Sequence, residues 1–346
     1  MVLALAPIIA LPQLIGGVLP VLAVPASGLE LLALVLLVID RARAGARIRA
    51  SVLAVPLLLG LALTLFEITP LPGAIVRALQ PVGAENVAWV TSLLHEGARA
   101  SIRSVLSLDP PETAFAAVRL IGALALLLVV TETCRKHRAR SLAFRFLLAS
   151  GILMFAVALG HQLLHINGAW GRFTMKTTFF YAPMVNPNQL ARVFGAISLA
   201  CVARSLTVRS RLELAWFLGG GIACGAAVFL TLSRGAMVAY AAGALVLGAL
   251  LLRDRKSGTH DSDDHDESGG SFAPLALGYF GVVAAIGLGL FLAQDTIVRE
   301  AASLGGETIE SSKLALYQPA LALVPDYGRV GVGNYAFGVA FMQHAS

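Results

Sequence analysis

Long apolar segments separated by short polar linkers run along the whole chain. Most of the segments approach the roughly 20 residues that a helix needs to cross a bilayer core of about 30 Å. The second and sixth are shorter, and they need tilt or a few flanking residues to span. The pattern predicts an all-α polytopic membrane protein with about nine transmembrane helices. These cover about residues 3–23, 27–39, 51–66, 114–130, 142–160, 190–203, 213–231, 236–252 and 274–293.

The composition agrees with a membrane protein and excludes an ordinary soluble one. Of the 346 residues, 57% are hydrophobic and 13% are charged, and the mean hydropathy is +0.79. The formal net charge of +6 comes from basic residues in the linkers, so it does not indicate a nucleic-acid-binding surface. The three cysteines lie in or beside predicted helices, without a disulfide framework or metal-ligand spacing.

His161 and His165 are spaced like residues on one helix face. A zinc site needs further ligands, and no third ligand is evident in the sequence. His260 and His265 lie in an acidic stretch where nothing fixes the geometry of a metal site. We therefore predict no metal.

Basic residues concentrate in every second linker, which is the pattern expected of cytoplasmic linkers. The N-terminus is therefore predicted to be cytoplasmic, and the linkers 67–113 and 161–189, the turn at 233–235 and everything after 293 are predicted to lie outside. The basic residues are Arg41, Arg43, Arg47 and Arg49, then Arg135, Lys136, Arg138 and Arg140, then Arg204, Arg209 and Arg211, and finally Arg253, Arg255 and Lys256.

Two regions follow from this topology. Residues 1–293 form the predicted transmembrane domain, which includes a cytoplasmic acidic linker at 253–273. Residues 257–270 of that linker are polar without apolar periodicity, as in a disordered segment. Residues 294–346 are predicted to begin a large outer loop. No closing span follows this loop in the sequence.

Arg234 is placed at the outer turn of a predicted helical hairpin, in Ser233-Arg234-Gly235. An arginine near hydrocarbon is costly unless it snorkels, pairs or binds an anion. Its planar guanidinium suits phosphate and stays charged at any working pH. The alternative is that Arg234 only extends its charged group to the membrane surface. The topology gives no reason for such a residue here, because basic residues are favoured in the cytoplasmic linkers and this turn is predicted to lie outside. The pattern therefore favours an anion-binding role for Arg234.

The second outer loop adds polar residues on the same side as Arg234. Asn186-Pro187-Asn188 is a turn and helix-start signal. Its role is either a helix cap or the binding of an oxyanion or sugar hydroxyls by Asn186, Asn188 and the free helix end. Arg172 and Arg192 add positive charge nearby.

A transporter would need polar residues inside its spans and an internal repeat. Glu30 and Arg119 are interpreted as lying near the ends of their segments, and no repeat is evident. The polar residues gather in the outer loops instead. A polysaccharide-related transporter or flippase and a non-catalytic membrane scaffold remain the alternatives from other functional classes.

Five short motifs occur in an order that resembles the O-antigen ligase and polymerase-like membrane proteins of bacteria. The resemblance covers about residues 50–346. The motifs are Thr69-Pro70-Leu71-Pro72, Ser107-Leu108-Asp109-Pro110, Asn186-Pro187-Asn188-Gln189-Leu190-Ala191, Ser233-Arg234-Gly235-Ala236 and Gly331-Val332-Gly333-Asn334-Tyr335-Ala336-Phe337.

The resemblance implies a metal-independent, cofactor-free, inverting glycosyltransferase on a GT-C-like helical membrane fold. Such enzymes take a glycan from undecaprenyl diphosphate at the periplasmic face of the bacterial inner membrane. They transfer it to a sugar hydroxyl of lipid A–core or a growing polysaccharide. An O-antigen or exopolysaccharide polymerase and a protein O-oligosaccharyl transferase are the alternatives within this class.

The resemblance also implies roles for particular residues. Arg234 holds the donor diphosphate, and Lys313 stands where the family has a second arginine. Arg172 and Arg192 are candidates to assist, with Ser233, Asn186 and Asn188 positioning the substrate or its loops. The family's catalytic histidine follows the glycine-rich turn at a greater distance than His344 does. His344 is the candidate base within the chain, and the true base is expected beyond Ser346. The resemblance therefore implies that the chain is a C-terminally truncated fragment that lacks roughly two or three spans.

Overall fold

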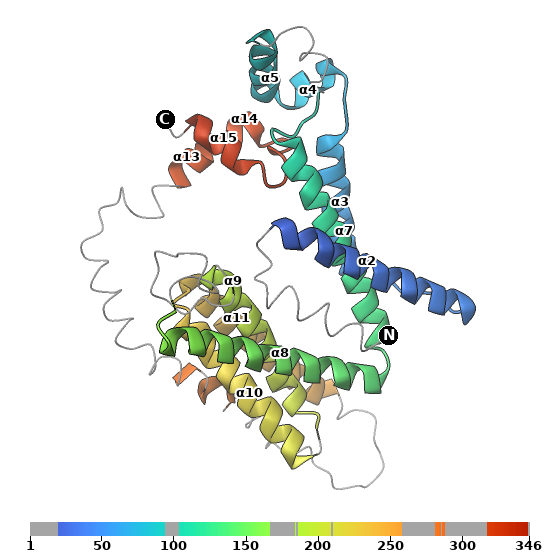
Figure 1. Ribbon diagram of the computed structural model, residues 1–346, viewed down its shortest axis with the longest axis vertical. Helices are drawn as coiled ribbons and strands as arrows, with labels where there is room; N and C mark the ends of the chain where they lie inside the picture. Colours follow the sequence, from blue (N-terminus) through green and yellow to red (C-terminus); the bar gives the residue numbers. More distant parts are fainter. Residues whose placement is uncertain are drawn as a thin grey trace, which may run out of the picture. The chain divides into compact units, whose positions relative to one another are not determined.

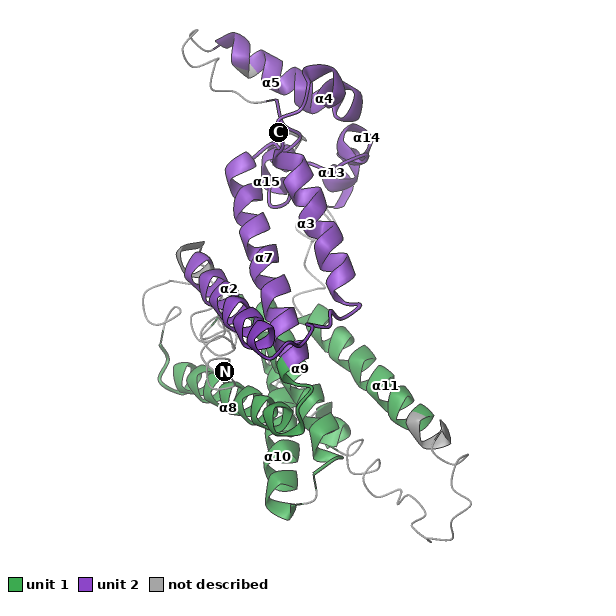
Figure 2. Cartoon of the chain, turned by 90° about the vertical axis from the view of Figure 1, so that its right-hand side faces the viewer, with its two compact units in different colours: residues 1–23, 133–302 green, residues 24–132, 303–346 purple. Residues whose placement is uncertain are grey.

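The computed structural model describes residues 20–93, 104–166, 184, 186–208, 210–257, 281–284, 286, 287 and 317–344 (Figure 1). Within these ranges the regular elements are helices and no strand occurs, so the all-α prediction is confirmed there. The chain divides into two compact units, one with residues 1–23 and 133–302 and the other with 24–132 and 303–346 (Figure 2). Each unit is described separately.

The described residues of unit 1 include four long helices: α8 (His137–Leu163), α9 (Pro187–Ser205), α10 (Arg211–Leu230) and α11 (Arg234–Ser257). Helix α9 packs along α10 and also contacts α8 and α11. Phe194, Met154 and Phe217 are fully buried between these helices. A short helical segment at 281–287, of which residue 285 is not described, adds Val282 to the same core.

Contacts between the helices establish their directions. Arg204 Nη2, at the end of α9, donates to Ser141 Oγ near the start of α8 (3.3 Å). Arg145 of α8 pairs with Glu213 near the start of α10. Helix α8 therefore runs parallel to α10 and antiparallel to α9. Helix α11 runs parallel to α9, because Gly195 faces Tyr240 near their starts and Leu199 faces Gly243 one turn further on.

Unit 2 combines long helices with a cluster of short ones. Helix α2 includes Pro25 and is helical across residues 24–26, which separate the first two predicted apolar segments. The Arg41 guanidinium pairs with Glu132 (2.9 Å), which joins the ends of α2 and α7. Its described helices are α2 (Pro20–Arg43), α3 (Ala54–Ile68), α4 (Gly73–Leu79), α5 (Pro81–Leu93), α7 (Pro110–Thr133), α13 (Tyr317–Ala322), α14 (Val324–Tyr327) and α15 (Phe337–His344).

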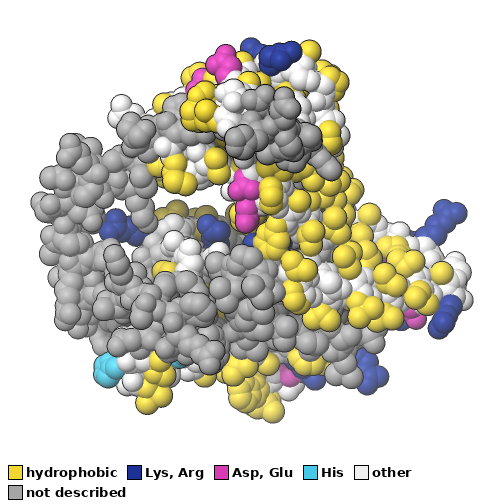
Figure 3. All heavy atoms as spheres, turned by 45° about the horizontal axis from the view of Figure 1, so that its top comes forward, with side chains coloured by type: hydrophobic (Ala, Val, Ile, Leu, Met, Phe, Trp, Pro, Cys, Tyr) yellow, Lys and Arg dark blue, Asp and Glu magenta, His cyan; other side chains and the backbone are white. Residues whose placement is uncertain are grey.

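Among the described residues, four helices are long and apolar enough to cross a membrane: Pro110–Thr133, His137–Leu163, Arg211–Leu230 and Arg234–Arg253. Their outer faces expose large apolar side chains, and hydrophobic residues cover much of the described surface in Figure 3. A soluble protein would rarely expose so extensive an apolar surface. The chain is therefore a membrane protein.

Two sequence-based placements need correction. Glu30 and Arg119 lie near the middles of α2 and α7, not near helix ends. Glu30 packs so closely on α7 that a Cβ at Gly122 would collide with its carboxylate. The hairpin turn is also displaced, since it comprises Thr231, Leu232 and Ser233, and Arg234 is already the first residue of α11.

Candidate functional site at the starts of helices α9 and α11

Helix α9 begins with an asparagine cap. Asn186 Oδ1 accepts a hydrogen bond from the Asn188 backbone N–H (2.9 Å), and Pro187 occupies the first turn. Proline is favoured there because the first N–H groups of a helix have no intrahelical partner. Of the two roles considered for this motif, capping is the one that the geometry supports. Asn188 and Arg192 are both exposed.

In the turn before α11, Ser233 is buried, and Arg234, which follows it, is exposed. The Ser233 N–H donates to Thr231 Oγ1 (3.3 Å), and the Ala236 N–H donates to Ser233 Oγ (3.4 Å). Leu232 has a φ of 54°, in a left-handed region that costs a non-glycine residue about 1–2 kcal/mol. Ser233 is buried and acts as a local cap, whereas Arg234 is exposed at the helix start.

A cavity of about 140 Å³ lies between the beginnings of these two helices. Most of its lining side chains are small, which leaves the space open where the helices pack. We call the beginnings of α9 and α11, with Arg192 and Arg234, the arginine end. The cavity is lined by Ala191, Arg192, Gly195, Ala196, Leu199, Ala236, Ala239 and Tyr240.

The electrostatics of the arginine end favour an anion. The start of each helix carries roughly half a positive charge, and its N–H groups point outward. Arg192 and Ala236 both line the cavity. Arg234 lies two residues before Ala236 in the sequence. Arg192 therefore lines one small cavity between two parallel helix starts, and Arg234 is the exposed first residue of one of these helices. This arrangement suits a phosphate or diphosphate, which arginine binds through paired hydrogen bonds.

A buried polar contact sets α11 against α9 just below the arginine end. Ser198 Oγ donates to the Gly221 carbonyl (2.6 Å) and lies 2.9 Å from the Tyr240 hydroxyl. The Tyr240 ring packs edge-on against Phe229, with centroids 6.3 Å apart. These contacts join α9, α10 and α11. The sequence offered no signal for them beyond a serine and a tyrosine within apolar segments.

The end of unit 1 opposite the arginine end is also basic, because the termini of four helices bring arginines there. The start of α8, the end of α9, the start of α10 and the end of α11 meet there. These termini contribute residues that were assigned to cytoplasmic linkers, namely Arg138, Arg140, Arg204, Arg211 and Arg253. Arg145, from the first part of α8, lies at the same end. Arg192 and Arg234 are thus separated from them by the length of the helices.

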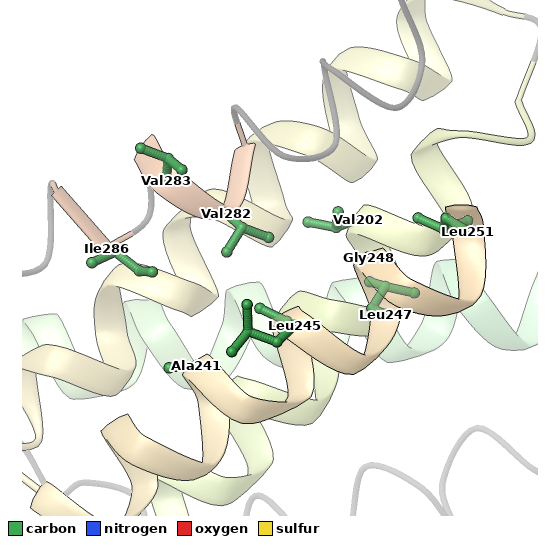
Figure 4. Close-up of a pocket in the computed structure, with 10 residues that line it drawn as sticks. Val202, Ala241, Leu245, Leu247, Gly248, Leu251, Val282, Val283 and Ile286 are labelled. Atoms are coloured by element: carbon green, nitrogen blue, oxygen red, sulfur yellow. The ribbon is translucent and has the colours of Figure 1, made fainter. Parts of the chain in front are cut away.

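An apolar groove follows α11 away from the arginine end. It has a volume of about 210 Å³ and lies between α11, Val202 of α9 and the segment 281–287 (Figure 4). Ala241, Leu245 and Gly248 lie along its α11 side. Its side chains offer no charge or hydrogen bond, so the groove suits hydrocarbon.

In unit 2, the residues Gly331–Tyr335, here called the glycine turn, contact the predicted first outer loop. The Val332 carbonyl accepts a hydrogen bond from the Leu108 N–H (3.0 Å). The Asn334 carbonyl accepts one from Thr113 Oγ1 (3.0 Å), and Gln80 Nε2 donates to the Gly331 carbonyl (2.8 Å). Two of the five motifs noted in the sequence, the one at 107–110 and the one at 331–337, are thereby brought into one polar cluster.

Glu67 is central to this cluster, and the sequence did not single it out. Its Oε2 accepts a hydrogen bond from the Asn334 N–H (3.2 Å), while its carbonyl accepts from Leu106 and Ser107. The residue is 5% exposed. A glutamate directly after an apolar segment was the available signal, but such residues usually face water.

Tyr335 is held in an unusual conformation at the end of the glycine turn. Its φ is 68°, and its residue exposure is 56%. The Arg119 guanidinium carbon lies 5.6 Å from the centre of its ring, a cation–π contact. Nearby, burial and Asp326 raise the pKa of the Tyr327 hydroxyl, while its hydrogen bond with Asn86 acts in the opposite direction.

Several predicted site residues fall outside the described part of the chain. Arg172 and Lys313 belong to ranges that are not described, as does most of the acidic linker. His344 is the last residue of α15, and its side chain is not described. Within the described ranges, no group of three or more histidine, cysteine or acidic side chains could hold a metal ion.

No family model, curated protein or solved structure matches this chain. Function must therefore be inferred from the geometry of the chain itself. The arginine end of unit 1 is the strongest candidate site, because it combines charge, helix starts, a cavity and an adjoining apolar groove.

Proposed function

We propose that this protein is a membrane glycosyltransferase that takes a glycan from undecaprenyl diphosphate. The acceptor is a sugar hydroxyl of lipid A–core or of a growing polysaccharide, at the periplasmic face of the bacterial inner membrane. The observation that supports this most strongly is the arginine end. There, Arg192 and Arg234 lie at the starts of two parallel packed helices, opposite the basic end.

The arrangement of unit 1 supports a lipid-linked anion over a soluble one. Arg234 and Arg192 supply charge at the end of apolar helices. The apolar groove along α11 suits the hydrocarbon of the same molecule. An amphiphile whose diphosphate sits at the arginine end can extend its tail toward the groove while remaining in the bilayer.

The proposed reaction is a single displacement at the anomeric carbon. The acceptor oxygen forms the new glycosidic bond as the bond to the diphosphate breaks, and the electron pair passes to the departing diphosphate oxygen. Guanidinium groups that stabilise this growing charge more than the ground state lower the barrier. A general base takes the acceptor proton. His344 is the candidate for this role within the chain, and the configuration inverts.

The same proposal includes nine transmembrane helices in a GT-C-like arrangement and a cytoplasmic N-terminus. The gathering of Arg138, Arg204, Arg211 and Arg253 at one end of unit 1 supports this orientation. Cytoplasmic ends of membrane helices are enriched in lysine and arginine. The arginine end would then face the periplasm.

The direct test is retention of the lipid donor. The full chain is purified from bacterial membranes in mild detergent, and co-purifying polyprenyl diphosphate glycans are measured by mass spectrometry. Arg234→Ala and Arg192→Ala should each reduce retention about tenfold or more, because a charge-assisted pair to phosphate is lost. Arg140→Ala is the matched control, since Arg140 is exposed at the opposite end. It should retain the wild-type amount.

Two outcomes would count against this proposal. If the wild-type protein retained no lipid diphosphate, it would not bind the proposed donor. Equal losses in Arg234→Ala and Arg140→Ala would mean that general charge, not the arginine end, governs retention. Transfer of the retained glycan to added lipid A–core, measured on gels, then separates an enzyme from a binding scaffold.

A transporter or flippase is the second candidate, and one observation favours it. Glu30 and Arg119 lie near the middles of α2 and α7, and ionisable residues at such depth commonly mark a substrate or ion path. Reconstituted protein that moves a fluorescent polyprenyl diphosphate across liposomes, with loss of movement in Glu30→Ala, would support this candidate. An absence of movement alongside glycan transfer would exclude it.

A further inference from the structure

A second cavity lies between α8 and α10, at the basic end of unit 1. Its volume of about 310 Å³ falls in the range of roughly 300–1,000 Å³ that is typical of ligand pockets. The helices pack closely further along, where Gly220 contacts Leu148 and Gly151 faces Cys224. Toward their N-terminal ends, α8 and α10 leave this cavity between them. We call this space the interfacial cavity.

The interfacial cavity is polar at its mouth and apolar inside. Arg145 and Glu213 form an ion pair there, with side chains 59% and 30% exposed. Leu148 and Phe217 line the interior and are buried, whereas Trp216 is 59% exposed at the edge. Trp216 lies five residues into α10, about 7.5 Å from its start at 1.5 Å per residue. Tryptophan is enriched at this depth, where headgroups meet acyl chains.

We propose that the interfacial cavity binds phosphatidylethanolamine from the surrounding leaflet. The headgroup of this lipid carries a phosphate and a primary ammonium a few bonds apart, matching the cation and anion of the Arg145–Glu213 pair. The phosphate pairs with the guanidinium and the ammonium donates to the carboxylate. The first part of one acyl chain enters the apolar interior beside Trp216. This site is independent of the donor site at the arginine end.

Charge selects this lipid over the other common ones. The Glu213 carboxylate repels the net negative headgroup of phosphatidylglycerol. Phosphatidylcholine has a quaternary ammonium without N–H groups, so it cannot donate a hydrogen bond to Glu213. The proposal therefore predicts selectivity and not merely lipid binding.

The test uses purified, delipidated full chain titrated with the three lipids and analysed by native mass spectrometry. Phosphatidylethanolamine should bind about tenfold better than phosphatidylcholine, the ratio expected for one charge-assisted hydrogen bond. Glu213→Gln should bring the two lipids within about twofold of each other, because the carboxylate charge is lost. Glu85→Gln makes the same charge change at an exposed position of α5 and should leave the selectivity unchanged.

A second measurement locates the bound lipid independently. Brominated phosphatidylethanolamine should quench tryptophan fluorescence more than brominated phosphatidylcholine, and Trp216→Phe should remove that difference. Stronger binding of phosphatidylglycerol, or selectivity that survives Glu213→Gln, would overturn the proposal. A selective quench that persists in Trp216→Phe would place the lipid elsewhere and overturn it as well.

Discussion

At the scale of single residues, the glycine turn requires glycine at position 333. Gly333 has a φ of 99°. A Cβ there would lie 2.5 Å from Ser107 Oγ and 2.9 Å from Thr113 Oγ1, the two hydroxyls that bond to each other. Both the backbone conformation and the available space therefore require glycine at this position.

We predict that Gly333→Ala destabilises unit 2 by about 1–3 kcal/mol, the usual cost of a strained backbone at such a site. Gly338→Ala is the control, because a Cβ at that position would have nothing within 4 Å and alanine favours the helix. Thermal unfolding in detergent, followed by intrinsic fluorescence, measures both. Equal midpoints for the two variants would contradict the prediction.

Glu67 allows a second residue-scale prediction. Glu67→Ala leaves the Asn334 N–H without its carboxylate acceptor, which should cost about 1–3 kcal/mol. Glu67→Gln keeps an acceptor oxygen in place and should cost less. Protection of the glycine turn from proteolysis should decrease in the order wild type, glutamine variant, alanine variant. A glutamine variant less stable than the alanine variant would show that the hydrogen bond is not what Glu67 contributes.

At the scale of helices, small residues set how closely unit 1 packs. Gly151 of α8 faces Ile197 of α9 and Cys224 of α10, where a Cβ would lie 2.9 Å and 3.0 Å from their side-chain atoms. In a membrane, helices have little hydrophobic drive to associate, so close packing at small residues supplies much of the attraction. Gly151 therefore stands at the junction of three helices.

We predict that Gly151→Val destabilises unit 1 by about 1–3 kcal/mol, because overpacking forces the neighbouring side chains to move. Gly160→Val changes the same helix at a position with nothing within 4 Å and should have a smaller effect. Resistance to unfolding by sodium dodecyl sulfate in mixed micelles compares the two. If Gly160→Val were the more damaging, helix propensity rather than packing would be the cause.

At the scale of the whole molecule, the basic termini of unit 1 predict the side on which each end lies. In a cysteine-free background, Asn188→Cys should react in intact bacterial cells with a maleimide that cannot cross the inner membrane. Arg138→Cys should react only after permeabilisation. Both positions are exposed, and they lie at opposite ends of the helices. The reverse pattern would place the arginine end in the cytoplasm and remove the basis of the proposed function.

Much of the architecture was accessible from local sequence patterns. The apolar segments at 142–160, 213–231 and 236–252 coincide with α8, α10 and α11, and the Asn186-Pro187 signal does start a helix. The first two predicted segments were separated at residues 24–26, but α2 is helical across this gap and includes Pro25. The misplacement of Glu30 and Arg119 follows from this, because helix ends cannot be located from apolar runs alone.

The sequence by itself determined that the chain is helical, membrane-bound and basic at alternate linkers, because apolar periodicity, caps and charge act over a few neighbouring residues. Only the tertiary structure decided which distant residues meet. Glu67 and Asn334 are 267 positions apart. Arg192 of α9 and Ala236 of α11 line the same cavity, and the contact between Ser198 and Tyr240 joins these two helices. Such contacts depend on how whole helices pack, and no local pattern encodes them.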